Sequence, residues 1–524
     1  MSIPLPLFVA IPLAGAFLLP IIGAFGRKGK AVATVLANVA TILLLVLACL
    51  SMGQSRVYEV GRWSIPLGIN MVLDGLSSLV LLAISIVSAA AMFYSVRYME
   101  QYTAKPKYLT LFLLMVAGMN GVALSGDLFN LFVFLEIASL ASYALVGFGC
   151  EHEELEASFK YMVLGSIGSL FVLFAVALVY GNTGSLNMAY VSKAIQAKAL
   201  DGSGMTGLAF ALALFVVGFG LKAALVPFHA WLPDAHPSAP APISAMLSGI
   251  LIKTLGVYAL ARVVFNVFGV SVEIGWLLVA LGILSMVAGA FLALGQWDFK
   301  RLLAYSSISQ IGYVVLGLAL GGLIMAKGAD ADFARQNPEW PNWAALAILG
   351  GVFHLVNHAV YKSLLFLTSG SVQMATGTRE MRKMGGLAET MPVTRATCTV
   401  ASASIAGIPP FSGFWSKLLL VWAAVAAHFY WVAAIIVFVS LCTLIMYLKV
   451  QRHVFLGELP ESLRQTKENT GSMLVSMVFL ACLSALMGLL LVPALRAGIL
   501  EPAVEALTRG VSYSADVIKM AMKV

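Results

Sequence analysis

Apolar stretches recur along the whole chain and are separated by short polar segments. A helix of about 20 residues crosses the ~30 Å hydrocarbon core of a bilayer, so each such stretch predicts a membrane-spanning helix. The first stretch lacks a positive n-region and is too long for a signal peptide, so we count it as a span. We predict an all-α polytopic membrane protein, with an amphipathic segment from Arg496 onward. The fourteen predicted spans are residues 4–25, 31–51, 70–94, 108–125, 128–150, 160–180, 205–226, 241–266, 273–296, 302–325, 343–371, 397–425, 429–455 and 471–495.

Two of these spans combine a lysine with a proline break. The seventh ends in LKAALVPFHAWLP, where Pro227 and Pro233 should interrupt the helix four residues beyond Lys222. The twelfth contains GIPPFSGFWSK, which ends at Lys417. Broken spans in corresponding places of two halves are typical of inverted-repeat transporters with sites near mid-membrane. The two lysines are 195 residues apart (417 − 222), which fits two repeats of about five helices each.

The polar segments between spans give further local predictions. The tripeptide SGD, ending at Asp127, predicts a hairpin between the fourth and fifth spans with Asp127 as an N-cap. Asp74 opens the third span, and we expect both aspartates to be interfacial rather than ion-binding. The stretch EHEELE (residues 151–156) is predicted to be a solvated acidic loop; the alternatives are a proton funnel or a docking site for a basic partner.

Composition and charge agree with a membrane protein. Of the 524 residues, 60% are hydrophobic and 11% are charged, about half the charged share of a soluble protein. Of the 32 Lys and Arg, seventeen lie in odd-numbered loops and eleven in even-numbered loops and the C-terminal segment. The positive-inside tendency therefore predicts odd loops in the cytoplasm and both termini outside. This asymmetry explains the net charge of +8 without nucleic acid as a partner. The five cysteines are far apart and form no CxxC, so we expect no metal or cofactor in this chain.

A small set of ionisable side chains falls inside the predicted spans. Intramembrane ionisable residues usually face a bundle interior or a hydrated cavity and mark ion pathways. Structural alternatives remain: Glu136 as an ion-pair partner only, Lys222 as a snorkelling lysine, Lys253 as a purely structural charge. The set comprises Glu136, Lys222, Lys253, Lys362, Lys417, His354 and His358.

Three members of this set share one helix face. In FHLVNHAVYKSLL, His354, His358 and Lys362 are spaced i, i+4 and i+8, a rise of about 12 Å along a helix. We interpret them as a proton relay. The alternatives are satisfied core histidines and a lysine that merely anchors the segment.

These residue types suit proton storage and transfer. Burial weakens the hold of a lysine on its proton, and a nearby carboxylate strengthens it again. At an effective dielectric near 20, a Glu–Lys pair at about 4 Å is worth about 4 kcal/mol, which is enough to switch a proton site. Movement of Glu136 toward and away from Lys222 would therefore load and unload the lysine. Histidine accepts and donates on opposite ring nitrogens and suits the middle of such a chain. Ser306 and Gln310, in YSSISQIGY, are suited to hold bridging waters, or alternatively to join helices.

The motifs carry a family resemblance. The stretch LKAALVPFHAWLPDAHPSAPAPISAMLSGILIK (residues 221–253) resembles the signature of the proton-translocating antiporter-like family. That family includes pumping subunits of respiratory complex I, the A and D subunits of Mrp-type Na⁺/H⁺ antiporters, and subunits of membrane-bound hydrogenases and formate hydrogenlyases. GDLFNLFVFLEIASLASYAL, HLVNHAVYKSLLFLTSG, RKMGGL and GIPPFSGFWSK match further family segments in order, over residues 70–455. The length and RKMGGL are similar to the Mrp D type, whereas NHAVYKSLLFLTSG is equally similar to the hydrogenase subunit.

The resemblance implies an architecture and roles. Helices 4–8 and 9–13 would form inverted five-helix repeats with broken helices 7 and 12. The chain would divide into residues 1–107, the repeats 108–266 and 267–455, and the segment 456–524. Glu136 becomes the carboxylate of the fifth helix, Lys222 and Lys417 the lysines of the broken helices, and Lys253, His354 and His358 the relay. As accessory candidates we name His229, Lys362, Ser306 and Gln310.

The functional prediction is an ion-translocating subunit, moving H⁺ or exchanging Na⁺ for H⁺, in the inner cell membrane. Its expected partners are other membrane subunits of a hetero-oligomeric complex and the lipid bilayer. The chain has no flavin, quinone or iron–sulfur motif, so redox chemistry would belong to partner subunits. Two alternatives are a non-conducting scaffold, which should lose its buried charges, and a stand-alone solute transporter, which should have a substrate-sized polar pocket.

Overall fold

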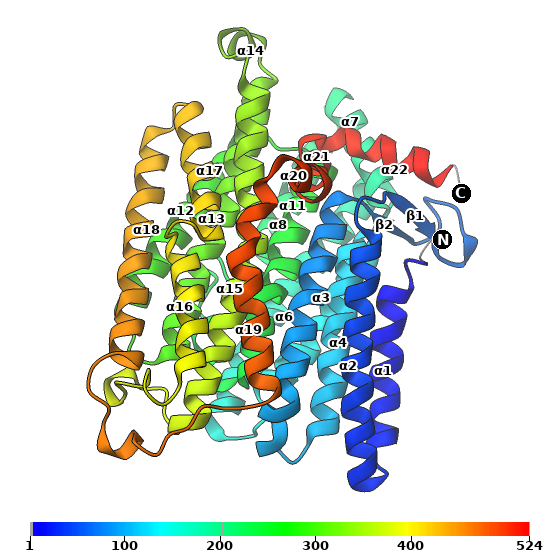
Figure 1. The fold of residues 1–524 in the computed structure, drawn as a ribbon. Helices are drawn as coiled ribbons and strands as arrows, with labels where there is room; N and C mark the ends of the chain where they lie inside the picture. Colours follow the sequence, from blue (N-terminus) through cyan, green and yellow to red (C-terminus); the bar gives the residue numbers. More distant parts are fainter. Residues whose placement is uncertain (1–3, 202–203, 523–524) are drawn as a thin grey trace.

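The computed structural model describes residues 4–201 and 204–522. Within them, twelve helices are long and apolar enough to cross a membrane, and α1 (Leu7–Gly23) and α17 (Ser412–Ala426) are shorter apolar helices. Figure 1 shows an upright bundle with the N and C ends on the same side. We call this side the terminal side, and the opposite side, which carries the connection from α18 (Tyr430–Val450) to α19 (Ser472–Leu486), the loop side.

The remaining elements follow in chain order. The first half contains α2 (Gly26–Ser51), β1 (Arg56–Glu59), η1 (Val60–Arg62), β2 (Asn70–Leu73), α3 (Gly75–Tyr98), η2 (Met99–Gln101), α4 (Lys105–Leu124), α5 (Leu128–Val146), α6 (His152–Thr183), α7 (Met188–Asp201), α8 (Met205–Lys222), α9 (Leu232–Ser238), α10 (Ala241–Met246), η3 (Leu247–Leu251), η4 (Lys253–Tyr258), α11 (Ala259–Ala261) and η5 (Arg262–Phe268). The second half contains α12 (Val272–Leu294), α13 (Phe299–Gly328), α14 (Ala331–Gln336), α15 (Trp340–Thr376), η6 (Met381–Lys383), α16 (Pro392–Ala406), η7 (Gln451–Phe455), η8 (Glu461–Leu463), η9 (Met487–Leu491), α20 (Pro493–Ile499), α21 (Glu501–Thr508), η10 (Gly510–Ser512) and α22 (Tyr513–Ala521).

Several local predictions are confirmed and others are wrong. Asp127 caps α5 by accepting a hydrogen bond from the Asn130 N–H at 2.8 Å, as predicted. The start of the third predicted span is instead strand β2, which pairs antiparallel with β1, and the helix begins only after Asp74. The acidic stretch 151–156 is not a loop, because α6 begins at His152. Glutamates in a first turn complement the helix dipole, which explains why this stretch is helical.

Both predicted breaks are present. Helix α8 ends at Lys222 itself, so the break follows that residue directly and not four residues later. Backbone groups freed by a break inside a membrane need new partners. The Trp231 indole donates to the Leu221 carbonyl at 3.0 Å, and Ser285 Oγ accepts from the Val226 N–H at 2.9 Å. The second break separates α16 from α17, which Figure 1 places one above the other.

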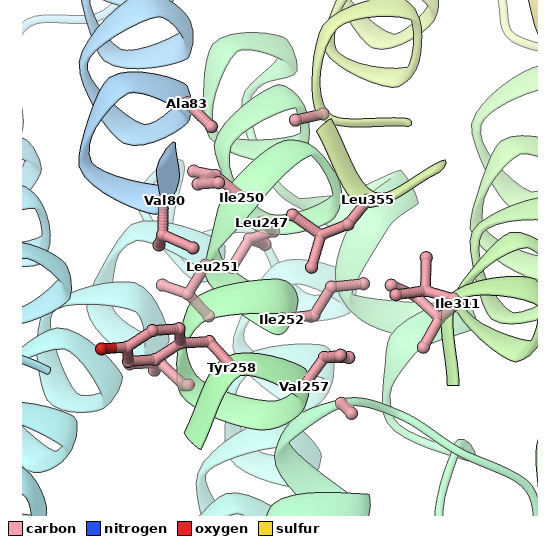
Figure 2. Packing of buried hydrophobic residues seen from close by; sticks show 14 of the residues in the cluster. Val80, Ala83, Leu247, Ile250, Leu251, Ile252, Val257, Tyr258, Ile311 and Leu355 are labelled. Carbon is pink, nitrogen blue, oxygen red and sulfur yellow. The ribbon is translucent and has the colours of Figure 1, made fainter. Parts of the chain in front are cut away.

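The span that starts at α10 is the centre of the bundle. Every residue from 239 to 267 is buried. Figure 2 shows side chains of η3 and η4, and Ile252 between them, packed among Val80 of α3, Leu355 of α15 and Ile311 of α13. Much of this span is π-helical, in η3, η4 and η5. Such π-helical turns are rare and frequently occur at functional sites. A span enclosed by protein on all sides is a suitable place for polar groups that lipid would not tolerate.

Small residues set the closest helix approach. A Cβ atom on Gly282 of α12 would lie 2.9 Å from the Leu316 backbone nitrogen, and one on Gly289 would lie 2.5 Å from that of Ser309. Glycine at these positions lets the backbones of α12 and α13 touch, as is common between membrane helices. This tight contact keeps α13, which carries Ser306 and Gln310, in a fixed position.

Candidate functional site

The structure brings Glu136 and Lys222 together at the end of the broken helix. Glu136 Oε1 lies 3.7 Å from Lys222 Nζ. Lys222 also donates to Ser139 Oγ at 2.9 Å and to the Tyr143 hydroxyl at 3.1 Å, while Ser169 donates to Glu136 Oε1. The ammonium therefore has neutral partners within hydrogen-bond distance and a carboxylate just beyond it. A small shift of either charged side chain would make or break direct contact.

Lys253 lies in the fully enclosed central span. Its Nζ donates to the carbonyls of Ser248 and Gly249, at 2.5 and 2.6 Å. Both carbonyls belong to the π-helical stretch η3. The side chain thus lies back along its own helix, held by neutral oxygens, and its charge is buried without a carboxylate partner among the described residues.

Close backbone contacts connect this span to the neighbouring site helices. A Cβ on Gly256 would lie 2.5 Å from the Cα of Ala223, the residue after Lys222. A Cβ on Gly249 would lie 2.0 Å from Ser363 Oγ, beside Lys362. The central span therefore touches the broken end of α8 on one side and α15 on the other.

Lys362 belongs to a buried hydroxyl cluster. Its Nζ donates to Ser306 Oγ and lies 3.3 Å from the Tyr447 hydroxyl, and these two hydroxyls are 2.9 Å apart. The side chain is fully buried. Lys362 is consequently not a surface anchor. This removes the main alternative to its membership in the set of buried proton-relay candidates.

The two histidines of α15 lie side by side and differ in their partners. Their ring centroids are 6.5 Å apart. His354 bonds Ser416 Oγ at 2.9 Å through Nδ1 and Gln310 Oε1 at 3.1 Å through Nε2. Neither ring nitrogen of the fully buried His358 has a hydrogen-bond partner among the described residues. Buried polar atoms are nearly always satisfied, so two unpaired ring nitrogens set His358 apart from His354.

Lys417 lies at the second break. It donates to the Ile405 and Ala406 carbonyls, at 2.8 and 3.3 Å, and to Ser440 Oγ at 3.1 Å. Those carbonyls end α16, so the negative end of that helix dipole faces the ammonium. Ser416, the residue before Lys417, bonds His354. The second break is therefore joined directly to the histidine pair.

The site candidates from the sequence thus fall mostly into one buried series. Two candidates are partly exposed: Glu136, whose side chain is 26% exposed, and His229, which lies in the break after α8 and does not join the series. Sequence reasoning missed the hydroxyl partners Ser139, Tyr143 and Ser169. A signal was present for two of them, since Ser139 and Tyr143 follow Glu136 at i+3 and i+7 on the same helix face.

The second group that the sequence did not reveal is a buried ion pair on the terminal side. Arg262 Nη2 lies 2.5 Å from Asp74 Oδ1, and both side chains are 6% exposed. Asp74, expected to be interfacial rather than ion-binding, thus has a buried arginine partner, a pairing that the sequence did not predict. It could not have been foreseen, because 188 residues separate the partners.

Comparison with known proteins gives two family matches. Residues 125–332 and 343–443 match the family described as the transmembrane region of NADH:quinone oxidoreductase and Mrp antiporters. Residues 59–109 match the N-terminal region of chain 5 of complex I, the NADH-ubiquinone oxidoreductase.

Individual proteins agree with these matches. The chain is 34% identical over 435 residues to the D subunit of the Na⁺/H⁺ antiporter of Alkalihalophilus pseudofirmus, covering 82% of each chain. It is 35% identical over 462 residues to the N subunit of NADH-quinone oxidoreductase of Desulforudis audaxviator, covering 87% of this chain and 86% of the relative. A chain in the structure of the Mrp complex from Dietzia sp. superposes with a TM-score of 0.84 at 29% identity, covering 98% of this chain and 99% of that one.

Proposed function

The chain belongs to the NADH:quinone oxidoreductase/Mrp antiporter membrane family, and from this we propose that it is an ion-translocating subunit of a multi-subunit membrane complex. Protons move along the buried series from the Glu136–Lys222 pair through Lys253 and the α15 histidines to Lys417. In the assembled complex this movement is coupled either to Na⁺ exchange or to redox chemistry in partner subunits.

The observation that carries the proposal is the environment of Lys222. The Lys222 side chain is 3% exposed, and its ammonium is bonded to two hydroxyls and has one carboxylate 3.7 Å away. At an effective dielectric near 20, a charge pair at this distance is worth about 4 kcal/mol. That is weak enough for the pair to separate and strong enough to change whether the lysine holds its proton. A structural pair would be expected to close into direct contact, since a loose buried pair does not recover its desolvation cost.

Glu136 also supports an assembly with other subunits. Its side chain is 26% exposed, on the face of α5 that also exposes Phe129 and Leu140 by 45% or more. A carboxylate turned toward hydrocarbon is costly. A partner subunit that covers this face with polar or cationic groups would remove the cost, and would place Glu136 between two subunits.

The two alternatives are less well supported. A scaffold has no use for four lysines buried at mid-span, each of which costs stability. A solute transporter should have a substrate-sized polar pocket near mid-membrane, but the cavities beside Val257 of the central span measure only about 10 Å³ each, and the larger polar hollows lie on the loop side. We orient the loop side to the cytoplasm, because the Lys- and Arg-rich odd loops gather there.

The direct test is ion transport by the whole complex in everted membrane vesicles. We expect Glu136→Gln and Lys222→Ala each to lower proton transport by on the order of 100-fold, with normal assembly on native gels. Measurement with and without Na⁺ on the opposite side separates exchange from proton pumping.

Matched controls use the same residue types at exposed positions. Glu100, which pairs with Arg97 at the surface, is changed to Gln, and the exposed Lys107 is changed to Ala. Both controls should transport at the wild-type rate. Normal transport by the assembled Glu136→Gln and Lys222→Ala complexes would refute the proton-carrying role of the pair.

A further inference from the structure

A tryptophan on the loop side is in contact with two cations. Trp297 lies in the connection between α12 and α13 and is half-buried. Lys449 Nζ lies 4.1 Å from the centre of its ring, and Arg382 Cζ lies 4.4 Å from it. His453, the residue after Arg452, meets the edge of the same ring with the centroids 5.1 Å apart. Each cation is attracted to the indole, but the two positive charges repel each other and are best placed together when an anion lies between them.

Protein carboxylates do not supply this anion. Among the described residues, Arg382, Lys449 and Arg452 form no ion pair within 4 Å. Arg382 and Arg452 are exposed, and Lys449 donates to two carbonyls at and just beyond the end of α12, at 2.9 and 2.5 Å. The neighbouring Arg379 does pair with Asp298, at 3.2 Å. The missing ion pairs are therefore a feature of the group Trp297, Arg382, Lys449 and Arg452, which we call the Trp297 cluster.

The net charge of the Trp297 cluster suits a phosphate group. Glu380 acts on the charge of Lys449, and against this carboxylate stand the three cations of the cluster. A phosphate oxygen accepts strong hydrogen bonds from arginine, and one guanidinium frequently donates two of them. The two exposed arginines can therefore bind a phosphate from outside, while Lys449 adds its charge from behind.

An apolar seam leads away from the cluster along the outside of the bundle. Helix α18 lies at the outer edge of the bundle (Figure 1), and Phe438 of α18 meets Phe291 of α12 with ring centroids 6.2 Å apart. Four side chains of α18, spaced three or four residues apart and each at least 50% exposed, share one helix face: Phe438, Leu441, Ile445 and Leu448. Arg452 follows Leu448 by four residues, in the same span. The apolar seam thus ends at a cation of the cluster.

We propose that the Trp297 cluster and the seam between α12 and α18 bind one anionic phospholipid from the leaflet on the loop side. Arg382 and Arg452 bind the phosphate of the headgroup, and the acyl chains lie along Phe291, Phe438 and Leu448. Basic pockets at the cytoplasmic ends of membrane helices bind anionic headgroups, and tryptophan favours the depth of the headgroups. This inference goes beyond the proposed function and does not depend on any residue that carries protons.

The bound lipid would join three segments that are distant in sequence. Arg382 belongs to η6, after α15, whereas Trp297 precedes α13 and Arg452 belongs to η7, after α18. A phosphate held by both arginines bridges η6 and η7. The same phosphate neutralises the repulsion around Trp297. The lipid should therefore stabilise the loop side of the second half of the chain.

The first test measures lipid affinity. The intact complex is stripped of lipid in detergent and titrated with dioleoyl phosphatidylglycerol, and bound lipid is counted by native mass spectrometry. Arg382→Gln with Arg452→Gln should weaken the binding of one phosphatidylglycerol roughly 30-fold, the factor expected for two basic contacts with an anionic headgroup. Zwitterionic dioleoyl phosphatidylcholine should bind the variant and the wild type equally. An unchanged affinity for phosphatidylglycerol in the assembled variant overturns the proposal.

Two controls separate the site from general charge effects. Arg27→Gln with Lys28→Gln removes the same charge from exposed positions at the turn between α1 and α2. This variant should bind phosphatidylglycerol as the wild type does. Inorganic phosphate at the lipid concentration should not displace the lipid, because it gains nothing from the seam. Displacement by inorganic phosphate would show a site for a free anion and would overturn the lipid site.

The second test identifies the occupant in native membranes. A photoreactive benzoylphenylalanine replaces Leu448, and the product of irradiation is analysed by mass spectrometry. We expect an adduct with an anionic phospholipid, and an adduct with neutral lipid when Arg382→Gln and Arg452→Gln are also present. A cross-link to a partner subunit would show that protein covers the seam, and would overturn the proposal. Because the first cross-link needs no arginine change, it decides the question even if the double variant does not assemble.

Discussion

At the scale of single residues, the mid-span lysines have neutral partners. Lys253 and Lys417 are held by backbone carbonyls and Lys362 by hydroxyls. Neutral oxygens accept a hydrogen bond from an ammonium and equally from a neutral amine, whereas a carboxylate in contact would fix the positive charge. A lysine with neutral partners can therefore lose its proton without leaving an unpaired carboxylate behind. Among the mid-span lysines in the described part of the chain, only Lys222 has a carboxylate nearby. In the proposed function, Glu136 is therefore the side chain that can change the protonation state of the series.

Tyr143 should tune this pair without being essential. Tyr143→Phe removes one of the two hydroxyls that Lys222 bonds and leaves Ser139 Oγ in place. A net hydrogen bond is worth about 1 kcal/mol, so we expect initial proton transport to change roughly fivefold and not to vanish. Tyr430→Phe, an exposed tyrosine, is the control. A complete loss with normal assembly would mean that the Tyr143 hydroxyl itself carries protons.

At the scale of elements, the spacing of the buried lysines depends on close contacts between helix backbones. The broken end of α8 meets η4 where a Cβ on Gly256 would lie 2.5 Å from the Ala223 Cα. That contact sets the separation of Lys222 and Lys253, because each lysine lies within three residues of it. A larger side chain at Gly256 can be accommodated only if η4 and the end of α8 move apart.

Gly256→Val should therefore separate the two elements. Overpacking of a filled interior costs about 1–3 kcal/mol, so we expect a lower unfolding temperature of the solubilised complex together with slower transport. The control is Gly181→Ala in α6, where an added Cβ meets nothing within 4 Å. Slow transport at an unchanged unfolding temperature would also support the idea that Gly256→Val moves Lys222 and Lys253 apart. A normal transport rate with a normal unfolding temperature would show that the Gly256–Ala223 contact is not needed.

The elements were predicted well from the sequence where neighbouring residues in the chain determine them. Membrane-length apolar runs and the proline breaks are local signals, and they located the helices and both lysines at the breaks. The π-helical turns around Lys253 were not predictable, because packing on all sides imposes them. Lys300 was assigned to a loop because DFKR is polar in sequence, although α9 and α13 bury it. Burial of a charged residue is a property of its neighbours in space.

At the scale of the whole molecule, the C-terminal segment is fastened to the core on the terminal side. Asn266 donates to the Ala506 and Gly510 carbonyls, and the Tyr513 ring covers the Arg262 guanidinium opposite Tyr258, each about 5 Å away. Arg262 is in turn bonded to Asp74, the cap of α3. The amphipathic end predicted from Arg496 onward is thus held by residues of the central span.

Loss of Asp74 should weaken this end of the molecule. Asp74→Ala leaves a buried guanidinium without its carboxylate, and breaking a buried pair in this way costs about 3–5 kcal/mol. We expect a lower unfolding temperature and easier proteolysis after residue 496.

The dependence of stability on acid pH follows from the same Asp74–Arg262 pair. Burial alone would raise the pKa of Asp74, but the Arg262 charge and the hydrogen bonds from Arg262 and the Ser77 N–H hold it below the usual value. Its contribution is therefore complete above pH about 4 and is lost as the pH falls further.

A double variant distinguishes the effect of the unpaired Arg262 charge from the effect of lost packing around Asp74. Asp74→Leu with Arg262→Met replaces both ions with apolar groups of similar size, and such replacements of buried pairs are often neutral or stabilising. The double variant should recover most of the stability lost in Asp74→Ala and should lack the part of the acid-dependent loss below pH about 4 that the Asp74–Arg262 pair contributes. If it is as unstable as Asp74→Ala, the hydrogen bond that the Asp74 carboxylate accepts from the Ser77 N–H matters more than the ion pair. If Asp74→Ala itself is as stable as the wild type at neutral pH, the pair does not hold the C-terminal segment.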